Sequence, residues 1–160
     1  MKKLKLKKIE NQKRFSIFFI YTFMIRLLNK ADSQDYYNLL NQLTQVGTVT
    51  VEQFEEFVNS QNDRFSVIVW EEDSKIVACV TFLIEQKIQR SYSSVMHIED
   101  VVTDNNYRGR GISKKLLEKA KEIAKDKNCY KIILDCSESN IPFYQKLGFI
   151  QKEYQMVYRF

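Results

Sequence analysis

Residues 106–114 read Asn-Tyr-Arg-Gly-Arg-Gly-Ile-Ser-Lys, and this one stretch holds two of the four glycines in the 160-residue chain. A helical pattern follows, with one apolar face made by Ile112, Leu116, Leu117, Ala120, Ile123 and Ala124. A helix start leaves backbone N–H groups free and carries partial positive charge. Glycines just before it let an anion approach the backbone closely. With Arg108, Arg110 and Lys114, the stretch predicts a cradle for a diphosphate.

The stretch does not match two better-known phosphate signatures. The Gly-Lys-Ser/Thr order of a Walker A loop is missing, and position 114 is a lysine where a dinucleotide fingerprint has its third glycine. A surface turn that only caps the following helix therefore stays open as an alternative at this point.

On both sides of the loop, the hydrophobic periods predict alternating strands and helices. Strands are expected at 23–28, 65–70, 76–84, 93–103 and 130–136, and helices at 33–43, 50–59, 112–124 and 140–147. Two short strands are expected within 149–160. Asp32 or Ser33 should cap the first helix, and Thr50 with Gln53 forms a capping box for the second. The order predicts one α/β domain of the α+β type, with a mixed, mostly antiparallel sheet flanked by helices.

The basic character of the chain is concentrated at its N-terminus. The net charge is +5, from 25 basic and 20 acidic residues. Residues 1–14 hold seven basic side chains against Glu10, a local +6, which leaves 18 basic and 19 acidic side chains in the rest. The domain itself is therefore close to neutral, which argues against a nucleic-acid-binding face.

Residues 15–25 form an apolar run directly after this basic segment. The pair resembles the charged and apolar regions of a signal peptide or a short anchor. The run is too short to span a bilayer easily, Arg26 ends it, and no small-residue cleavage site follows. We expect residues 1–22 to be an extension of unknown role on a domain at 23–160, in a cytoplasmic protein. Membrane association through residues 1–22 is the less favoured alternative.

The cysteines and the single histidine bound the redox and metal chemistry. Cys79, Cys129 and Cys136 are odd in number and match no zinc spacing, so we expect small buried hydrophobes in a reducing compartment. His97 is the only histidine, which excludes a multi-histidine metal site. No metal is expected, and His97 is a weak candidate for a catalytic base.

Several separated segments resemble one known enzyme family. The Arg108–Ser113 loop resembles the Arg/Gln-x-x-Gly-x-Gly/Ala signature of the GNAT superfamily of N-acetyltransferases, with Ser113 off pattern at the last position. Further segments resemble the branch of that superfamily that acetylates glucosamine 6-phosphate. These are His97–Val102, Asn128–Ile132, Asn140–Phe149, Leu43–Gly47 and Glu52–Phe54. The resemblance spans residues 23–160.

The resemblance implies a GNAT fold that uses acetyl-CoA as co-substrate. The strand before the loop is expected to pair with the pantetheine arm as an added strand would. The implied contacts to acetyl-CoA are Asp100, Val101, Val102, Arg108, Gly109, Arg110, Gly111, Ile112, Ser113, Lys114, Asn140 and Tyr144. Tyr144 is expected to protonate the departing thiolate, because a phenol with a pKa near 10 suits a strongly basic leaving group.

The resemblance also implies an acceptor, the 2-amino group of glucosamine 6-phosphate, whose acetylated product feeds UDP-N-acetylglucosamine synthesis. Glu99 and Asp135 are expected as catalytic carboxylates near the amine. The implied contacts to the phosphosugar are Thr44, Lys87, Arg90, Glu99, Asp100, Tyr130, Lys131, Asp135 and Arg159. Lys131 and Arg159 are expected to act across a homodimer interface. In a regular strand, the neighbours Glu99 and Asp100 would point to opposite faces.

Two positions depart from the pattern of the relatives. Arg90 stands where a histidine is expected, and Pro142 replaces a glycine before Tyr144. Two other functions stay open: a GNAT enzyme acting on another amine, such as a protein lysine or a polyamine, and a non-catalytic module that binds CoA.

Overall fold

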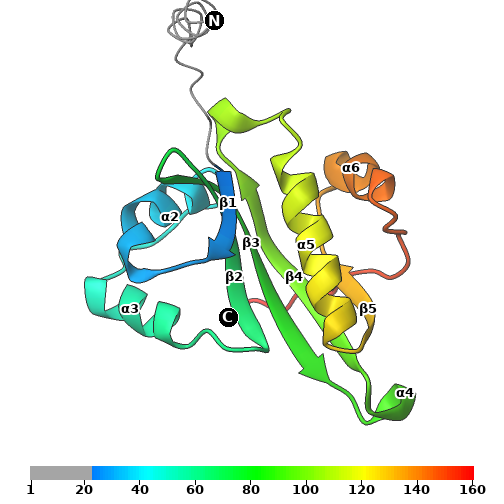
Figure 1. The fold of residues 1–160 in the computed structure, drawn as a ribbon. Helices are drawn as coiled ribbons and strands as arrows, with labels where there is room; N and C mark the ends of the chain where they lie inside the picture. Colours follow the sequence, from blue (N-terminus) through cyan, green and yellow to red (C-terminus); the bar gives the residue numbers. More distant parts are fainter. Residues whose placement is uncertain (1–22) are drawn as a thin grey trace, which may run out of the picture.

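The sheet has five strands (Figure 1). The structure is a computed structural model, and it describes residues 23–160. In both spatial and chain order the strands are β1 (Phe23–Leu27), β2 (Phe65–Glu72), β3 (Lys75–Gln86), β4 (Ser94–Thr103) and β5 (Cys129–Leu134). Neighbouring strands are antiparallel except for β4 and β5, which are parallel. The expected mixed, mostly antiparallel sheet is therefore confirmed. The predicted extension at 1–22 lies outside the described residues.

Helices cover the two faces of the sheet separately. The helices are α2 (Ser33–Leu40), α3 (Val51–Asn59), α4 (Gln89–Tyr92), α5 (Ile112–Asp126) and α6 (Ile141–Lys146), with 3-10 turns at Lys30–Asp32, Asn105–Tyr107 and Glu138–Asn140. Figure 1 shows α2 and α3 on one side of the strands and α5 on the other. No helix within residues 23–160 is long and apolar enough to cross a membrane.

Each face of the sheet has its own apolar core. Under α5, the fully buried Leu116 and Leu117 pack with Met96 and Val80. On the other face, Tyr36 and Leu39 of α2 pack with residues of β2 and β3. Complete burial of one such leucine contributes about 2 kcal/mol to stability. The core under α5 fixes this helix relative to the β4–β5 pair, and that pair carries the candidate site.

The helix caps are set by local sequence, one as predicted and one not. Thr50 and Gln53 form the predicted capping box, with bonds of 3.3 and 2.9 Å. The first helical segment is instead capped one turn earlier. There the Asn29 side chain accepts from the Ala31 N–H, and the Asp32 carboxylate accepts from the Asn29 N–H. Asp32 is thus occupied upstream and gives α2 no side-chain cap.

Three other predictions differ from the structure. The pattern predicts a first helix that reaches residue 43, but α2 ends at Leu40. The two strands expected within 149–160 are wrong, because these residues form neither helix nor strand. Their side chains alternate as a strand would, yet Tyr154 and Met156 are both 91% exposed, since no sheet edge pairs with them. Among the cysteines, Cys79 is buried as expected and Cys136 is exposed.

Candidate active site

The glycine loop enters α5 in a conformation that needs glycine. Gly109 has φ +78° and Gly111 has φ +75°, the left-handed region that side chains disfavour. Gly111 is the N-cap of α5, and no side chain caps that end of the helix. The N–H groups of the first turn therefore have no side-chain partner. A 15-residue helix with an uncapped start is suited to binding an anion.

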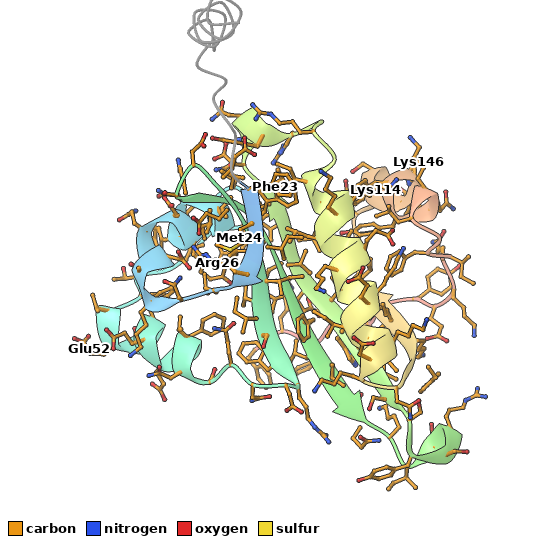
Figure 2. The ribbon with its side chains drawn as sticks, in the orientation of Figure 1. Phe23, Met24, Arg26, Glu52, Lys114 and Lys146 are labelled. Carbon is orange, nitrogen blue, oxygen red and sulfur yellow. The ribbon has the colours of Figure 1, made fainter. Side chains whose placement is uncertain are left out.

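The basic side chains of the loop divide into two kinds. Arg108 Nε donates to the Thr103 carbonyl at 3.2 Å, and Arg110 Nη1 donates to the Glu72 carboxylate at 3.3 Å. Both arginines therefore have partners within the protein. Lys114 is exposed on the first turn of α5, and Figure 2 shows it and Lys146 of α6 at the same end of the molecule. Of the three cations predicted for the cradle, Lys114 is the one that has neither a hydrogen bond nor an ion pair inside residues 23–160.

The parallel strands β4 and β5 part before β4 reaches the loop. Their pairing runs from Ser94 with Cys129 to Ile98 with Leu134 and ends there. β4 continues to Thr103, still paired with β3 on its other side. Backbone groups of Glu99–Thr103 thus have no strand partner on the β5 side within the described chain. An extended, amide-bearing molecule can add along such an edge as a strand does.

A bulge in β4 redirects the two adjacent carboxylates. Thr81 pairs with Glu99 and Cys79 pairs with Val102, so β4 has an extra residue between these pairs, and Asp100 takes φ +47°. The expectation that Glu99 and Asp100 point to opposite faces is therefore wrong. Glu99 and Val102 lie on the face covered by α2, because residues that pair directly across two strands share a face. Asp100 lies two residues before Val102 and therefore lies on the same face, beyond the extra residue of the bulge.

Glu99 lies in a cluster of negative charge. Burial raises the pKa of its carboxyl, and the charges of Asp100 and Asp135 raise it further, while His97 acts in the opposite direction. Asp135 follows β5 and accepts a 2.8 Å hydrogen bond from Gln155. The structure thus brings three predicted acceptor-site carboxylates together at the point where β4 and β5 part. Within residues 23–160 no such cluster is arranged to hold a metal ion.

Tyr144 is enclosed by aromatic rings on α6. Its ring meets those of Phe143 and Phe149 edge-on, with centroids 5.0 and 5.8 Å away. Only 9% of the residue is exposed, and burial together with the charge of Cys136 raises the pKa of its phenol. The hydroxyl therefore stays protonated at neutral pH. Asn140, also a predicted contact, is exposed in the turn before α6.

A pocket of cations lies farther along the same sheet face. It encloses about 270 Å³ and is lined by Glu85, Lys87, Gln89, Val95, His97, Tyr130, Lys131 and Ile133. Glu85 pairs with Lys87 and lies 3.3 Å from His97 Nε2. The Lys87 hydrogen bond lowers the pKa of the Glu85 carboxyl, and His97 adds to that effect. The pocket suits an anion larger than a carboxylate.

Arg90 of α4 lies beside the same pocket, over the ring of its lining residue Tyr130. Residues 90–92 all have positive φ, which makes α4 a short left-handed turn between β3 and β4. The Arg90 guanidinium lies 5.6 Å from the centre of the Tyr130 ring, and Lys131 Nζ lies 5.9 Å from it. Two predicted substrate contacts, Thr44 and Arg159, are not brought here: Thr44 follows α2 and Arg159 lies in the C-terminal segment.

Sequence reasoning missed two features of this face. Glu85 lines the cation pocket near the end of β3, and its place two residues before Lys87 was the available signal. A second cavity of about 550 Å³ lies between α2 and α3, with Tyr36, Tyr37, Phe54 and Phe57 in its wall and Asp100 at its edge. Burial raises the pKa of the Tyr36 phenol, helped by the charges of Cys79 and Asp100. The Tyr36 side chain thus borders Asp100 from α2.

Comparison with known proteins identifies the family. The model of the acetyltransferase (GNAT) family matches residues 29–149. A protein of Arabidopsis thaliana named glucosamine 6-phosphate N-acetyltransferase is 41% identical over 141 residues, covering 84% of this chain and 95% of that protein. A Dictyostelium discoideum protein named glucosamine 6-phosphate N-acetyltransferase 1 is 42% identical over 126 residues, covering 76% and 80%.

The fold agrees with the sequence comparison. The crystal structure of glucosamine-6-phosphate N-acetyltransferase from Arabidopsis thaliana superposes with a TM-score of 0.81 at 41% identity, covering 87% of this chain and 99% of that one. The resemblance inferred from residues 97–102, 108–113 and 140–149 is therefore confirmed, and so is the GNAT fold. This chain belongs to the acetyltransferase (GNAT) family.

Proposed function

We propose that this chain transfers the acetyl group of acetyl-CoA to the 2-amino group of glucosamine 6-phosphate. The observation that carries the proposal is the spacing of two sites on one face of β4. His97, in the cation pocket, and Glu99, in the carboxylate cluster, are two residues apart on that face, about 7 Å along the strand. An amino sugar that carries its phosphate at the other end of the ring bridges such a separation.

Acetyl-CoA supplies the activated acetyl thioester, and the residues around the β4–β5 opening fit it. The free backbone of Asp100, Val101 and Val102 suits the amides of the pantetheine arm. The first-turn N–H groups of α5, with Lys114, suit the diphosphate. Arg108 and Arg110 support this cradle by holding the loop. Asn140, exposed in the turn before α6, is the remaining proposed contact to acetyl-CoA.

Tyr144 is the proposed general acid. The sulfur that leaves the acetyl group needs a proton, and a phenol whose pKa is raised by burial keeps its proton at neutral pH. The ring contacts with Phe143 and Phe149 hold the side chain in one orientation. Pro142 in the first turn of α6 fixes the backbone just before it.

Glu99 and Asp135 are the proposed partners of the amine. They lie near enough for the charge of Asp135 to raise the pKa of the Glu99 carboxyl. A carboxylate accepts hydrogen bonds from an ammonium group and can take a proton as it becomes an amine. Asp100 is the proposed contact to a sugar hydroxyl from the α2 side.

The phosphate of the acceptor is proposed to bind Lys87, Lys131 and Arg90. Lys87 and Lys131 line the pocket, and Arg90 lies over the Tyr130 ring at its edge. Arginine and lysine donors suit a phosphate, by fork geometry and point charge respectively. The Glu85 carboxylate pairs with Lys87 and contacts His97, and phosphate oxygens can replace it as their partner.

Two predicted substrate contacts, Thr44 and Arg159, lie away from the site in this chain, and this leads us to propose a homodimer. The outer edge of β5 has no partner strand within residues 23–160, and the segment 150–160 is exposed, with apolar side chains such as Tyr154, Met156 and Phe160. A segment of alternating apolar residues and an open strand edge are complementary. We propose that a second copy contributes Arg159 to the phosphate pocket. The domain boundary at residue 23 and the cytoplasmic location stay predictions.

The deciding experiment measures thiol release from acetyl-CoA with four amines: glucosamine 6-phosphate, glucosamine, spermidine and a lysine peptide. Strong acetylation of glucosamine 6-phosphate and weak acetylation of glucosamine are expected. Equal rates on the two sugars would remove the role of Lys87, Lys131 and Arg90.

A second acceptor class has one observation in its favour. Glu99, Asp100 and Asp135 place three carboxylates together, which suits an acceptor with several positive charges. The cation pocket opposes it, because Lys87, Lys131 and Arg90 would repel a polyamine. Faster reaction with spermidine than with glucosamine 6-phosphate would reverse this choice.

A further inference from the structure

Glu72, at the end of β2, is a buried carboxylate next to the glycine loop. It is 8% exposed, and together with Asp32 it makes up the buried carboxylates of residues 23–160. Trp70 Nε1 donates to one of its oxygens at 3.4 Å, and Arg110 Nη1 donates to the other at 3.3 Å. A buried carboxylate destabilises a fold unless it is paired. Arg110 is the cation that pairs with this one.

Arg110 is held on three sides. Besides Glu72, its Nη2 donates to the Asn106 carbonyl at 3.3 Å, and its guanidinium lies 4.6 Å from the centre of the Tyr107 ring. Its own backbone lies between Gly109 and Gly111, both with positive φ. Glycines allow more backbone conformations than other residues, so this part of the loop depends on side-chain contacts to stay in one conformation.

The carboxylate has a rigid support of its own. Phe23 of β1 stacks on Trp70 with ring centroids 4.4 Å apart, and Lys115 Nζ of α5 lies 5.0 Å from both rings. Figure 2 shows Phe23 at the same end of the molecule as Lys114, where α5 begins. Glu72 is therefore held to the sheet through Trp70, and its bond with Arg110 holds the loop to the sheet.

We propose that Glu72 is a positioning residue for the diphosphate of CoA. Through Arg110 it holds the loop so that the first-turn N–H groups of α5 stay directed at the anion. The proposal rests on acetyl-CoA as the donor and is independent of the acceptor. It predicts that the contribution of Glu72 appears only with ligands that carry the diphosphate, and only while Arg110 is present.

The test is the Kd of CoA by calorimetry, for wild type, E72A, R110A and E72A/R110A, without any amine. E72A is expected to raise the Kd about two- to tenfold, the effect of ordering a mobile side chain and its loop on binding. In the R110A background the same change should have no further effect. In kinetics, E72A should raise the KM of acetyl-CoA, leave kcat unchanged and leave the KM of S-acetylpantetheine unchanged, because that donor lacks the diphosphate.

Two further variants keep the test decisive. E72Q retains one acceptor oxygen, so its Kd for CoA should fall between those of wild type and E72A. It allows the proposal to be tested even where E72A folds poorly. E71A removes the neighbouring carboxylate, which pairs with Arg26 away from the loop, and should leave the Kd of CoA unchanged. An unchanged or lower Kd in E72A overturns the proposal, as does an equal loss in the R110A background. If wild-type protein binds CoA but acetylates no phosphosugar, the proposed acceptor is overturned and the proposed role of Glu72 is not.

Discussion

Thr103 Oγ1 lies 2.6 Å from Ser113 Oγ, so the last residue of β4 is hydrogen-bonded to the first turn of α5. The bond joins the two ends of the loop that precedes the helix. Ser113 stands where the family pattern has glycine or alanine, and its hydroxyl is used by Thr103. The departure from the pattern therefore adds a contact within the protein and leaves the backbone N–H groups of the helix start free.

We expect S113A to destabilise the protein slightly without affecting the binding of CoA. Loss of one neutral hydrogen bond lowers the free energy of unfolding by about 1 kcal/mol. T103A should have a similar effect, and T103A/S113A should cost no more than either single change, because the two hydroxyls share one bond. Urea denaturation measures the stabilities and calorimetry the Kd of CoA. Additive losses would show that the two hydroxyls act separately.

Gly111 provides a second prediction with a matched control in the chain. Its φ is +75°, and a Cβ atom at this position would have no neighbouring atom within 4 Å, so G111A meets conformational strain and no clash. The strain is about 1 kcal/mol, and the altered loop should also raise the KM of acetyl-CoA. Gly47 has equal space and no positive φ, so G47A should change neither quantity. Thermal unfolding and initial rates check both; equal effects of the two variants would contradict the argument.

Local sequence was enough to predict the loop, α5 and the Thr50 cap. In each case residues within one or two turns supply the partners: glycines for positive φ, an apolar stripe for α5, and Gln53 for Thr50. The strand at 93–103 was equally clear, because its pattern needs no knowledge of its neighbours.

Long-range pairing decided what could not be predicted. The bulge at Asp100 comes from the register between β3 and β4, and that register determines which face Glu99 and Asp100 share. The cation pocket is lined by residues of β3, β4 and β5, and Glu85 meets His97 only because β3 and β4 are neighbours in the sheet. The residues 149–160 have a strand-like alternation, but a strand also needs an edge to pair with. No local pattern contains that information.

Y144F should lower kcat by about 100-fold, the usual size of a general acid's contribution. The ring contacts with Phe143 and Phe149 do not involve the hydroxyl, so stability and the KM of acetyl-CoA should change little. The control is Y92F, which removes the hydroxyl of a tyrosine that is 65% exposed on α4. Steady-state rates decide: a Y144F enzyme with normal kcat would assign the proton transfer elsewhere.

K87M and K131M should each raise the KM of glucosamine 6-phosphate about tenfold, because a hydrogen bond to a charged group contributes on the order of 1.5 kcal/mol. The KM of acetyl-CoA and the rate with free glucosamine should stay near wild type. K119M removes a lysine that pairs with Glu122 on the outer face of α5, and it serves as control. A rise in KM that is equal for both sugars would mean that the lysines do not bind phosphate.

The pH dependence of acetyl transfer should follow Glu99. Burial raises the pKa of its carboxyl, and the charges of Asp100 and Asp135 add to the rise. If the carboxylate holds the amine, kcat/KM falls as pH drops through this raised pKa, and E99Q should lose that acid limb. For stability the sign is opposite: what Glu99 contributes is present below its unfolded pKa and lost as pH rises through the folded value.

Two neighbours allow the acid limb to be moved in opposite directions. D135N removes a charge that raises the pKa of Glu99, so the limb should shift to lower pH. H97Q removes a group that lowers the same pKa, so the limb should shift to higher pH. The substrate's own titration is identical in all three profiles and cancels in the comparison. Carbon-13 NMR of the Glu99 carboxyl gives the pKa directly, including in a variant with low activity. Shifts in the same direction for both variants would show that the limb belongs to another group.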